Sequence, residues 1–383
     1  MERAIYLDYH ATTPVDPRVS QEMFPFFQDD FGNAGSLSHG FGEKAAHAID
    51  KSRQIVAKMI GAGSRSDVIF TSGATESNNI ALQGVLKVLS KQGKSHVVSS
   101  AIEHKSVLDV LACLEDQKLI DVSYLSPDKD GCFKINAIRD ALRPDTGLLS
   151  FMFVNNEIGI INPIKDIGEL SRQHGLVFHC DATQAAGKLP INVDDLGVDL
   201  LSISAHKIYG PKGVGALYVR NSCRLEPIIY GGGQERGLRP GTLPVPLIVG
   251  LAKAFEVANL EMSAEAVRIR RMRDELLKGL SGGIKDIVVN GSMEQRLYNN
   301  LNISFLGVKS DTLMMNLWND LAVSSGSACT SINWEGSYVL KAMGATSERV
   351  NSAIRFGLGR MTTDDEIAKA IPILRAAVAK LRA

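Results

Sequence analysis

The segment from Val198 to Gly215, VDLLSISAHKIYGPKGVG, decides the fold and indicates the chemistry of this chain. Its apolar run ends at Ser204, and Lys207 lies where that run gives way to a glycine-rich turn. A lysine that is partly shielded from water loses its proton more readily, and a neutral amine can bind a carbonyl carbon covalently. A single lysine in a turn is more often an ordinary surface residue, so the interpretation depends on other segments.

Short apolar runs alternate with helical periodicity from about residue 65 to residue 220. Strands are predicted at 68–71, 96–99, 148–154, 176–180 and 200–203, with helices at 77–90, 106–115 and 163–173. Residues 213–219 follow a glycine turn and are predicted as an edge strand. Apolar strands that alternate with amphipathic helices are typical of an α/β fold, with a mostly parallel sheet covered on both faces.

The pattern changes after the glycine- and proline-rich loop at 231–246. Helices are predicted at 247–260, 261–280, 312–317 and 364–381, and strands at 287–289, 302–305 and 352–356. This mixture is typical of an α+β unit. We therefore expect a large α/β domain over residues 16–257 and a small α+β domain over residues 258–383, which residues 1–15 join.

Composition excludes several classes of partner. The 42 basic and 42 acidic residues cancel and form no basic stripe, so neither nucleic acid nor an anionic membrane is expected as a partner. The apolar runs are too short to span a bilayer, and the first residues have no signal-peptide pattern. The five cysteines lie far apart, without metal-ligand or redox-motif spacing. We expect a soluble, cytoplasmic protein without a resident metal.

Two polar motifs follow predicted strands, where ligands collect in open α/β sheets. The turn TSGATES at 71–77 offers backbone amides and the Thr75 hydroxyl, a combination suited to a phosphate. Helix capping by Thr75 or Ser77 is an equally good interpretation of that turn alone. Asp181 follows an apolar run, where it could hold a protonated ring nitrogen or cap a helix.

A histidine and a cysteine complete the set. His104 could stack on a planar cofactor and move protons as a catalytic residue, although alone it is more readily explained as a partly buried, hydrogen-bonded side chain. Cys329 lies in SSGSACTS at 324–331, among small polar residues that favour a mobile loop and an accessible thiol. The lysine, the phosphate turn, the carboxylate and the histidine together match pyridoxal 5'-phosphate.

With these residues, the chain resembles the cysteine desulfurases of the NifS/IscS type, which are class-V aminotransferase-like enzymes of fold-type I. The resemblance runs from YLDY at 6–9 to RFGLGR at 355–360 and includes SGATES, VNNEIG, DATQ, HKIYGPKG and SSGSACTS in order. The loop around Cys329 is similar to that of the long-loop branch. The resemblance implies a mostly parallel seven-stranded sheet in the large domain.

The resemblance also implies a role for each matching residue. Lys207 would bind the cofactor covalently, and Cys329 would receive the sulfur. The cofactor phosphate would be bound by Ala74, Thr75, Ser204 and His206, with Thr242 from a neighbouring subunit, which implies a homodimer. Asp181 would face the pyridine nitrogen, His104 would stack on the ring, and Gln184 and Asn156 would contact the ring oxygen or its surroundings. Arg355, with Asn33, would bind the substrate carboxylate through paired hydrogen bonds.

The reaction implied is removal of sulfur from L-cysteine, which gives L-alanine and a persulfide on Cys329. Lys207 would act as the base for the α-proton. The sulfur would then pass to an acceptor, such as an iron–sulfur scaffold protein, and Cys329 could transiently bind a nascent cluster.

Four other functions are compatible with parts of this pattern. A selenocysteine lyase or an aminotransferase on the same scaffold would keep Lys207 and Asp181, but an aminotransferase has no use for Cys329. Selenocysteine lysis stays open. A non-catalytic relative would be expected to lose Lys207, Asp181 or Cys329, and a nicotinamide dehydrogenase would need a glycine fingerprint that is missing from the sequence.

Overall fold

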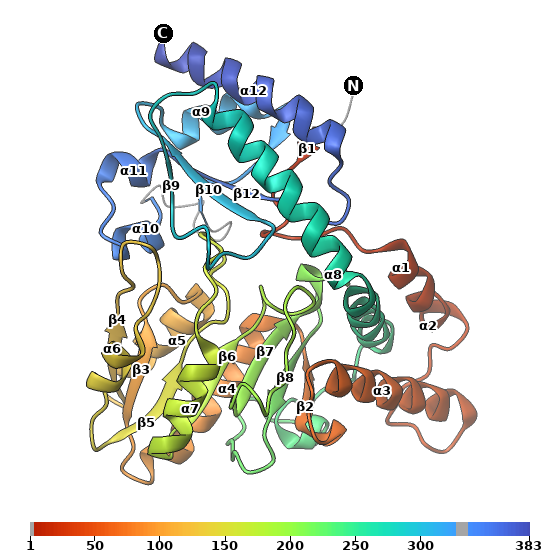
Figure 1. Ribbon diagram of the computed structural model, residues 1–383. Helices are drawn as coiled ribbons and strands as arrows, with labels where there is room; N and C mark the ends of the chain where they lie inside the picture. The colour runs from red at the N-terminus through yellow and green to blue at the C-terminus, as the bar shows by residue number, and fades with distance from the viewer. Residues whose placement is uncertain (1–3, 327–335) are drawn as a thin grey trace.

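A seven-stranded sheet forms the centre of the larger part of the molecule (Figure 1). The computed structural model describes residues 4–326 and 336–383. The strand order is β2 (Val68–Thr71), β8 (Gly215–Val219), β7 (Leu200–Ser204), β6 (Val177–Asp181), β5 (Thr146–Ser150), β3 (His96–Ser100) and β4 (Asp121–Leu125). β3 to β7 pair in parallel, and β8 is antiparallel to both of its neighbours. The predicted mostly parallel seven-stranded α/β fold is confirmed.

Two details of the predicted sheet are wrong. Residues 213–219 were expected at an edge, but β8 lies between β2 and β7, and the edges are β2 and β4. The strand expected at 148–154 ends at Ser150, although the amide of Phe153 still donates to the carbonyl oxygen of Asp181 in β6 at 2.9 Å. The amide of Met152 donates to the buried carboxylate of Glu103 at 2.7 Å, and Val154 forms an isolated bridge with Ile161.

Side chains alternate between two apolar cores on the two faces of the sheet. In β2, Val68 and Phe70 belong to one core, while Ile69 belongs to the other. The second core also receives the buried faces of α4 (Ala74–Ser90) and α5 (Lys105–Asp116). The first core receives α3 (Gly40–Met59) and α7 (Ile164–His174). Helices therefore cover both faces of the sheet, and the carboxyl ends of its strands stay uncovered.

One helix, α8 (Val245–Ser281), links this layer to the rest of the chain (Figure 1). Two helices with a break at residue 260 were expected, and this is wrong. The sequence between Gly250 and Gly279 contains no proline or glycine to end a helix. The expected domain boundary at residue 257 thus falls inside a continuous helix, and the division into two domains stays a prediction.

The smaller part contains a three-stranded antiparallel sheet in the order β12 (Ala353–Gly357), β10 (Asn300–Phe305) and β9 (Ile287–Val289). The N-terminal segment also belongs to this smaller part, because β1 (Ile5–Tyr6) pairs in parallel with β11 (Leu321–Ala322) in a separate two-stranded sheet. The remaining helices are α1 (Pro17–Met23), α2 (Pro25–Gln28), α6 (Ile135–Asp140), α9 (Ser310–Leu317), α10 (Tyr338–Ala342), α11 (Ser347–Asn351) and α12 (Asp364–Arg382). None of the helices described is both long enough and apolar enough to cross a bilayer.

Candidate active site

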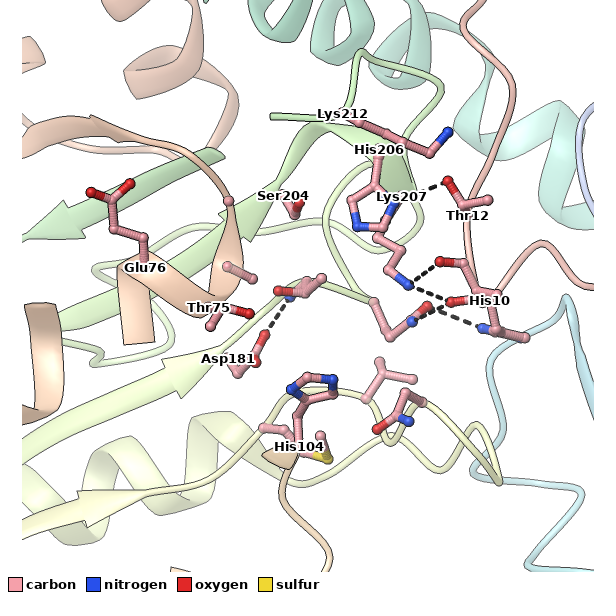
Figure 2. Close-up of a pocket in the computed structure, with 18 of the residues that line it drawn as sticks. His10, Thr12, Thr75, Glu76, His104, Asp181, Ser204, His206, Lys207 and Lys212 are labelled. Atoms are coloured by element: carbon pink, nitrogen blue, oxygen red, sulfur yellow. Dashed lines mark hydrogen bonds between the residues drawn. The ribbon is translucent and has the colours of Figure 1, made fainter. Parts of the chain in front are cut away.

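A cavity of about 460 Å³ opens at the carboxyl ends of the strands. Its polar lining comes from segments far apart in the sequence (Figure 2). The residues that line it are His10, Ala11, Thr12, Ser72, Gly73, Ala74, Thr75, Glu76, His104, Met152, Val154, Asn156, Asp181, Thr183, Gln184, Ser204, His206, Lys207, Lys212, Gly213 and Arg355. Parallel strands bring these segments together because their carboxyl ends meet at one edge of the sheet.

The helix start at Ala74 forms one wall of the cavity. Gly73 precedes α4 with a φ of 151°, which L side chains rarely adopt, and none of the described side chains caps the helix. A Cβ atom at Gly215 would lie 2.4 Å from the carbonyl oxygen of Ile203 and 2.7 Å from the Cα of Gly73. Two glycines therefore allow strand and turn to approach closely. Neither Thr75 nor Ser77 is the cap, so the amides at the helix start are available to an anion.

Lys207 lies immediately after β7, in the short 3₁₀ helix Ala205–Lys207. Its amine donates hydrogen bonds to the carbonyl oxygens of His10 at 2.6 Å and Ala11 at 2.7 Å, as Figure 2 shows. The side chain is half-buried. The fold thus holds this amine at the cavity, against the segment that precedes α1.

Asp181 is the last residue of β6 and is 5% exposed. One carboxylate oxygen accepts from the Asn78 amide at 2.9 Å, and the other accepts from the backbone amide of Thr183 at 2.9 Å. The Asn78 amide also donates to the Ser106 hydroxyl at 2.8 Å. The carboxylate is thus fixed at the cavity by α4 and by the turn that follows β6.

His104 lies beside that hydrogen-bond network and is the N-cap of α5. The backbone amide of Ser106 can only donate, and its 3.1 Å bond makes His104 Nδ1 the acceptor. The neutral ring therefore carries its hydrogen on Nε2. Burial lowers the pKa of His104 below its usual range, so the ring is uncharged near pH 7.

Arg355, from β12, is the largest of the almost completely buried side chains and is 1% exposed. Its guanidinium donates to Asp8 Oδ1 at 2.8 Å and to the carbonyl oxygen of Asn156 at 2.9 Å. The ion pair with Asp8 fixes one edge of the guanidinium. Its Nε atom finds no hydrogen-bond partner among the residues described.

Three cationic side chains, Lys207, Lys212 and Arg355, line this cavity beside two carboxylates, Glu76 and Asp181. Burial, together with the charges of Lys207, Lys212 and Lys188, lowers the pKa of His206 to about 4. His10 has its pKa lowered in the same way, by burial first and then by Arg355. Both histidines are therefore neutral near pH 7, and the surrounding cations favour an anionic ligand.

The donor set fits pyridoxal phosphate. The helix start at Ala74 and the Ser204 and His206 side chains suit a phosphate, and Asp181 suits a protonated ring nitrogen. Within the described part of the chain, four buried atoms of the lining lack hydrogen-bond partners: His10 Nε2, Asn156 Oδ1, Thr183 Oγ1 and Arg355 Nε. Unsatisfied buried polar atoms are costly, so a polar ligand in this cavity would supply what they lack.

Most of the residues predicted from the sequence meet in this cavity. These are Ala74, Thr75, His104, Asn156, Asp181, Gln184, Ser204, His206, Lys207 and Arg355. Asn33 and Thr242 do not line it, and both are exposed. The Asn33 side chain accepts instead from the amide of Gly35 at 2.9 Å. Cys329 lies outside the described residues.

Sequence reasoning missed several lining residues, chiefly His10, Thr12 and Lys212. Thr12 Oγ1 lies 3.1 Å from His206 Nδ1 and so holds one of the predicted phosphate ligands. The available signal was a histidine and two threonines directly after a short apolar segment at the chain start. Lys212 lies in the same glycine-rich turn that follows Lys207.

Comparison with known proteins decides the family. A family model described as aminotransferase class-V matches residues 5–369. The "Cysteine desulfurase IscS" of Anaeromyxobacter dehalogenans is 51% identical over 384 aligned residues, which cover 100% of this chain and 94% of the relative. The chain belongs to the class-V aminotransferase family and, within it, to the cysteine desulfurases.

Solved structures support the assignment of this desulfurase to its family. A "NifS-like protein" has a TM-score of 0.92 at 36% identity and covers 99% of this chain and 100% of its own. "SspA in complex with cysteine" has a TM-score of 0.81 at 38% identity, over 93% of this chain and 99% of its own. The predicted family, enzyme class and pyridoxal-phosphate dependence are confirmed.

Proposed function

We propose that this desulfurase removes sulfur from L-cysteine, gives L-alanine and a persulfide on Cys329, and passes that sulfur to an acceptor protein. The proposal depends above all on one observation. The Lys207 amine, the Asp181 carboxylate and the uncapped start of α4 surround a single cavity that Arg355 also lines.

The cofactor would be held by three groups of residues. The start of α4 with Thr75, Ser204 and His206 binds its phosphate, Asp181 binds its ring nitrogen, and Lys207 binds its aldehyde carbon covalently. When bound, pyridoxal phosphate supplies an electron sink that stabilises negative charge on the substrate carbon. His104 would stack on the ring, and Gln184 and Asn156 would contact its oxygen or the surroundings of that oxygen. Gln184 is suited to this because its amide is fixed by His10 Nδ1 at 3.0 Å and by the carbonyl oxygen of His10 at 3.1 Å.

The substrate would be oriented by Arg355. Two parallel hydrogen bonds from a guanidinium fix the direction of a carboxylate, which places the α-carbon near the Lys207 amine. Asn33, which precedes α3 and lies outside this cavity, stays a sequence-based prediction for the same carboxylate. Lys207 takes the α-proton and later returns protons to the carbon skeleton.

Cys329 would then receive the sulfur. Its thiolate attacks the substrate sulfur, so that a sulfur–sulfur bond forms as the carbon–sulfur bond breaks. The electron pair of the broken bond stays with the carbon skeleton, which takes up protons and leaves as L-alanine. The persulfide on Cys329 is the form in which sulfur reaches an acceptor such as an iron–sulfur scaffold protein.

The proposal includes a homodimer in the cytoplasm. Thr242 is exposed and lies outside the cavity of its own chain, which leaves it available to the phosphate site of a partner copy. The widely spaced cysteines suit a reducing compartment.

Two variants test the proposal. Lys207→Ala should lose the visible absorbance of the covalently bound cofactor, because the amine proposed to bind the aldehyde carbon is removed. Cys329→Ala should keep that absorbance but form no persulfide. Cys113→Ala, at an exposed cysteine of α5, is the matched control and should behave as the unchanged protein. An unaltered visible spectrum in Lys207→Ala would falsify the cofactor assignment, and comparison of L-cysteine with L-selenocysteine distinguishes the alternative substrate.

A further inference from the structure

A second lysine, Lys188, lies buried directly behind Lys207. Its side chain is 8% exposed, and its amine donates to the carbonyl oxygen of Lys207 at 3.0 Å and to that of Gln184 at 3.2 Å. Both hydrogen-bond partners of this amine are main-chain carbonyl oxygens. Among the residues described, no carboxylate lies within ion-pair distance of it. A lysine is rarely buried without an opposite charge, so its presence needs an explanation.

The position of Lys188 connects the two turns that form the site. One of its bonds reaches the turn after β6, which contains Gln184 and follows Asp181. The other reaches the turn after β7, which ends at Lys207. Gly187 allows these turns to pack closely, because a Cβ atom there would lie 2.8 Å from a methyl carbon of Ile208. The amine of Lys188 is thus held at a fixed place beside the backbone of Lys207.

The groups that face Lys188 do not neutralise it. A small cavity of about 10 Å³ beside it is lined by Lys207, Tyr209, Glu265, Tyr298 and Arg360. The carboxylate of Glu265 is already paired with the guanidinium of Arg360. His10 and His206 lie near enough for the charge of Lys188 to contribute to lowering the pKa of each. The Lys188 amine therefore adds positive charge to the Lys207 side of the site.

We propose, on the basis of the function proposed above, that Lys188 is a positioning residue that holds a positive charge behind Lys207 and so disfavours a second proton there. A proton on Lys207, or on the nitrogen through which it binds the cofactor, would place two like charges close together in a buried region. Burial, followed by the neighbouring Lys207, lowers the pKa of Lys188 itself to about 7. The charge on Lys188 therefore changes near neutral pH, which is the range in which acid–base groups of enzymes commonly work.

The test uses three substitutions in the cofactor-loaded protein. Lys188→Met removes both the charge and the hydrogen bonds, Lys188→Gln keeps a donor without the charge, and Lys188→Arg keeps the charge. The visible absorbance of the bound cofactor is titrated from acid to alkaline pH, and cofactor affinity is measured alongside. Lys253→Met, at a partly exposed lysine of α8, is the control for loss of a lysine elsewhere.

We expect the midpoint of the absorbance change to rise by about one pH unit in Lys188→Met and Lys188→Gln, because one nearby positive charge is lost. Lys188→Arg and Lys253→Met should stay close to the unchanged protein. Midpoints that do not move in Lys188→Met and Lys188→Gln would overturn the inference, as would a shift in Lys188→Arg as large as that in Lys188→Met. If Lys207→Ala keeps the same visible absorbance, the proposed function fails instead, so the two failures are distinguishable.

Discussion

The amide of Asn78 donates a 2.9 Å hydrogen bond to the carboxylate of Asp181 and, with its second hydrogen, a 2.8 Å bond to Ser106. Ser106 in turn fixes the ring of His104. A single buried side chain of α4 therefore orients two residues that are proposed to contact opposite parts of the same ring.

Because Asn78 acts on the ring only through Asp181 and Ser106, substitution of Asn78 should lower kcat less than substitution of Asp181. Asp181→Asn removes the charge opposite the ring nitrogen and should lower kcat about 100-fold, in line with the loss of a charge-assisted hydrogen bond. Asn78→Ala leaves the bond from Thr183 in place and should lower kcat only about 10-fold. Steady-state kinetics of the cofactor-loaded variants measure both, with Gln83→Ala on the same helix as control. Equal activity in Asp181→Asn and the unchanged protein would remove Asp181 from the mechanism.

Substitution of Arg355 should affect substrate binding more than turnover. Arg355→Lys keeps the charge but loses the planar pair of donors, so the KM for L-cysteine should rise about 10-fold or more. Asp8→Asn removes the ion pair that fixes one edge of the guanidinium, at an oxygen that also accepts from the Ser324 hydroxyl at 3.0 Å, and should raise KM by a smaller factor. Arg271→Lys, at an exposed surface arginine, is the control. A KM that is unchanged in Arg355→Lys would assign the carboxylate to another residue.

Gly215→Ala tests the close approach of β8 to the start of α4. The new methyl group would lie 2.4 Å from the carbonyl oxygen of Ile203 and 2.7 Å from the Cα of Gly73, so both segments must move. We expect a loss of about 1–3 kcal/mol in the free energy of unfolding, together with weaker cofactor binding. Gly63→Ala meets nothing within 4 Å and has no unusual φ, which makes it the control. Full stability and cofactor affinity in Gly215→Ala would show that the turn tolerates displacement.

The lowered pKa of Lys188 predicts that the folded protein becomes more stable as the pH rises. Its pKa is about 7 in the folded protein, against an ordinary value of 10.5 in the unfolded chain, so between these values the unfolded chain binds more protons. Stability should therefore rise with pH across this window, by at most about 1.4 kcal/mol for each pH unit. Thermal unfolding of the cofactor-free protein should show that the advantage of Lys188→Met over the unchanged protein is largest below pH 7 and shrinks toward pH 10. A difference that does not vary with pH would contradict the lowered pKa.

The sequence predicts those parts of the fold that depend on local pattern. β2, β6 and β7 are short and fully or almost fully buried, so their apolar runs are plain in the sequence. β4 was missed because it is an edge strand whose side chains are all exposed or half-exposed and whose apolar residues are interrupted by Ser123. The continuity of α8 was missed because its pattern changes near Leu260, which is 83% exposed, although nothing there ends the helix.

The candidate site likewise contains residues that the sequence predicts and residues that it does not. Lys207 and Thr75 follow strands and Asp181 ends one, and motif and position together were enough to predict that they meet. His10 and Lys188 were not found, because their contacts to Gln184 and Lys207 join segments that no local periodicity relates. Buried polar residues in turns are defined by their distant partners, and those become visible only in the folded chain.

The most direct test of the account is the fate of sulfur in a single incubation. The cofactor-loaded protein is mixed with L-cysteine without a reductant, and L-alanine is measured together with the mass of the peptide that contains Cys329. The account predicts one added sulfur atom on that peptide, one L-alanine formed for each, and neither product in Lys207→Ala. L-alanine formed without sulfur on Cys329, or sulfur found on Cys113 instead, would contradict it.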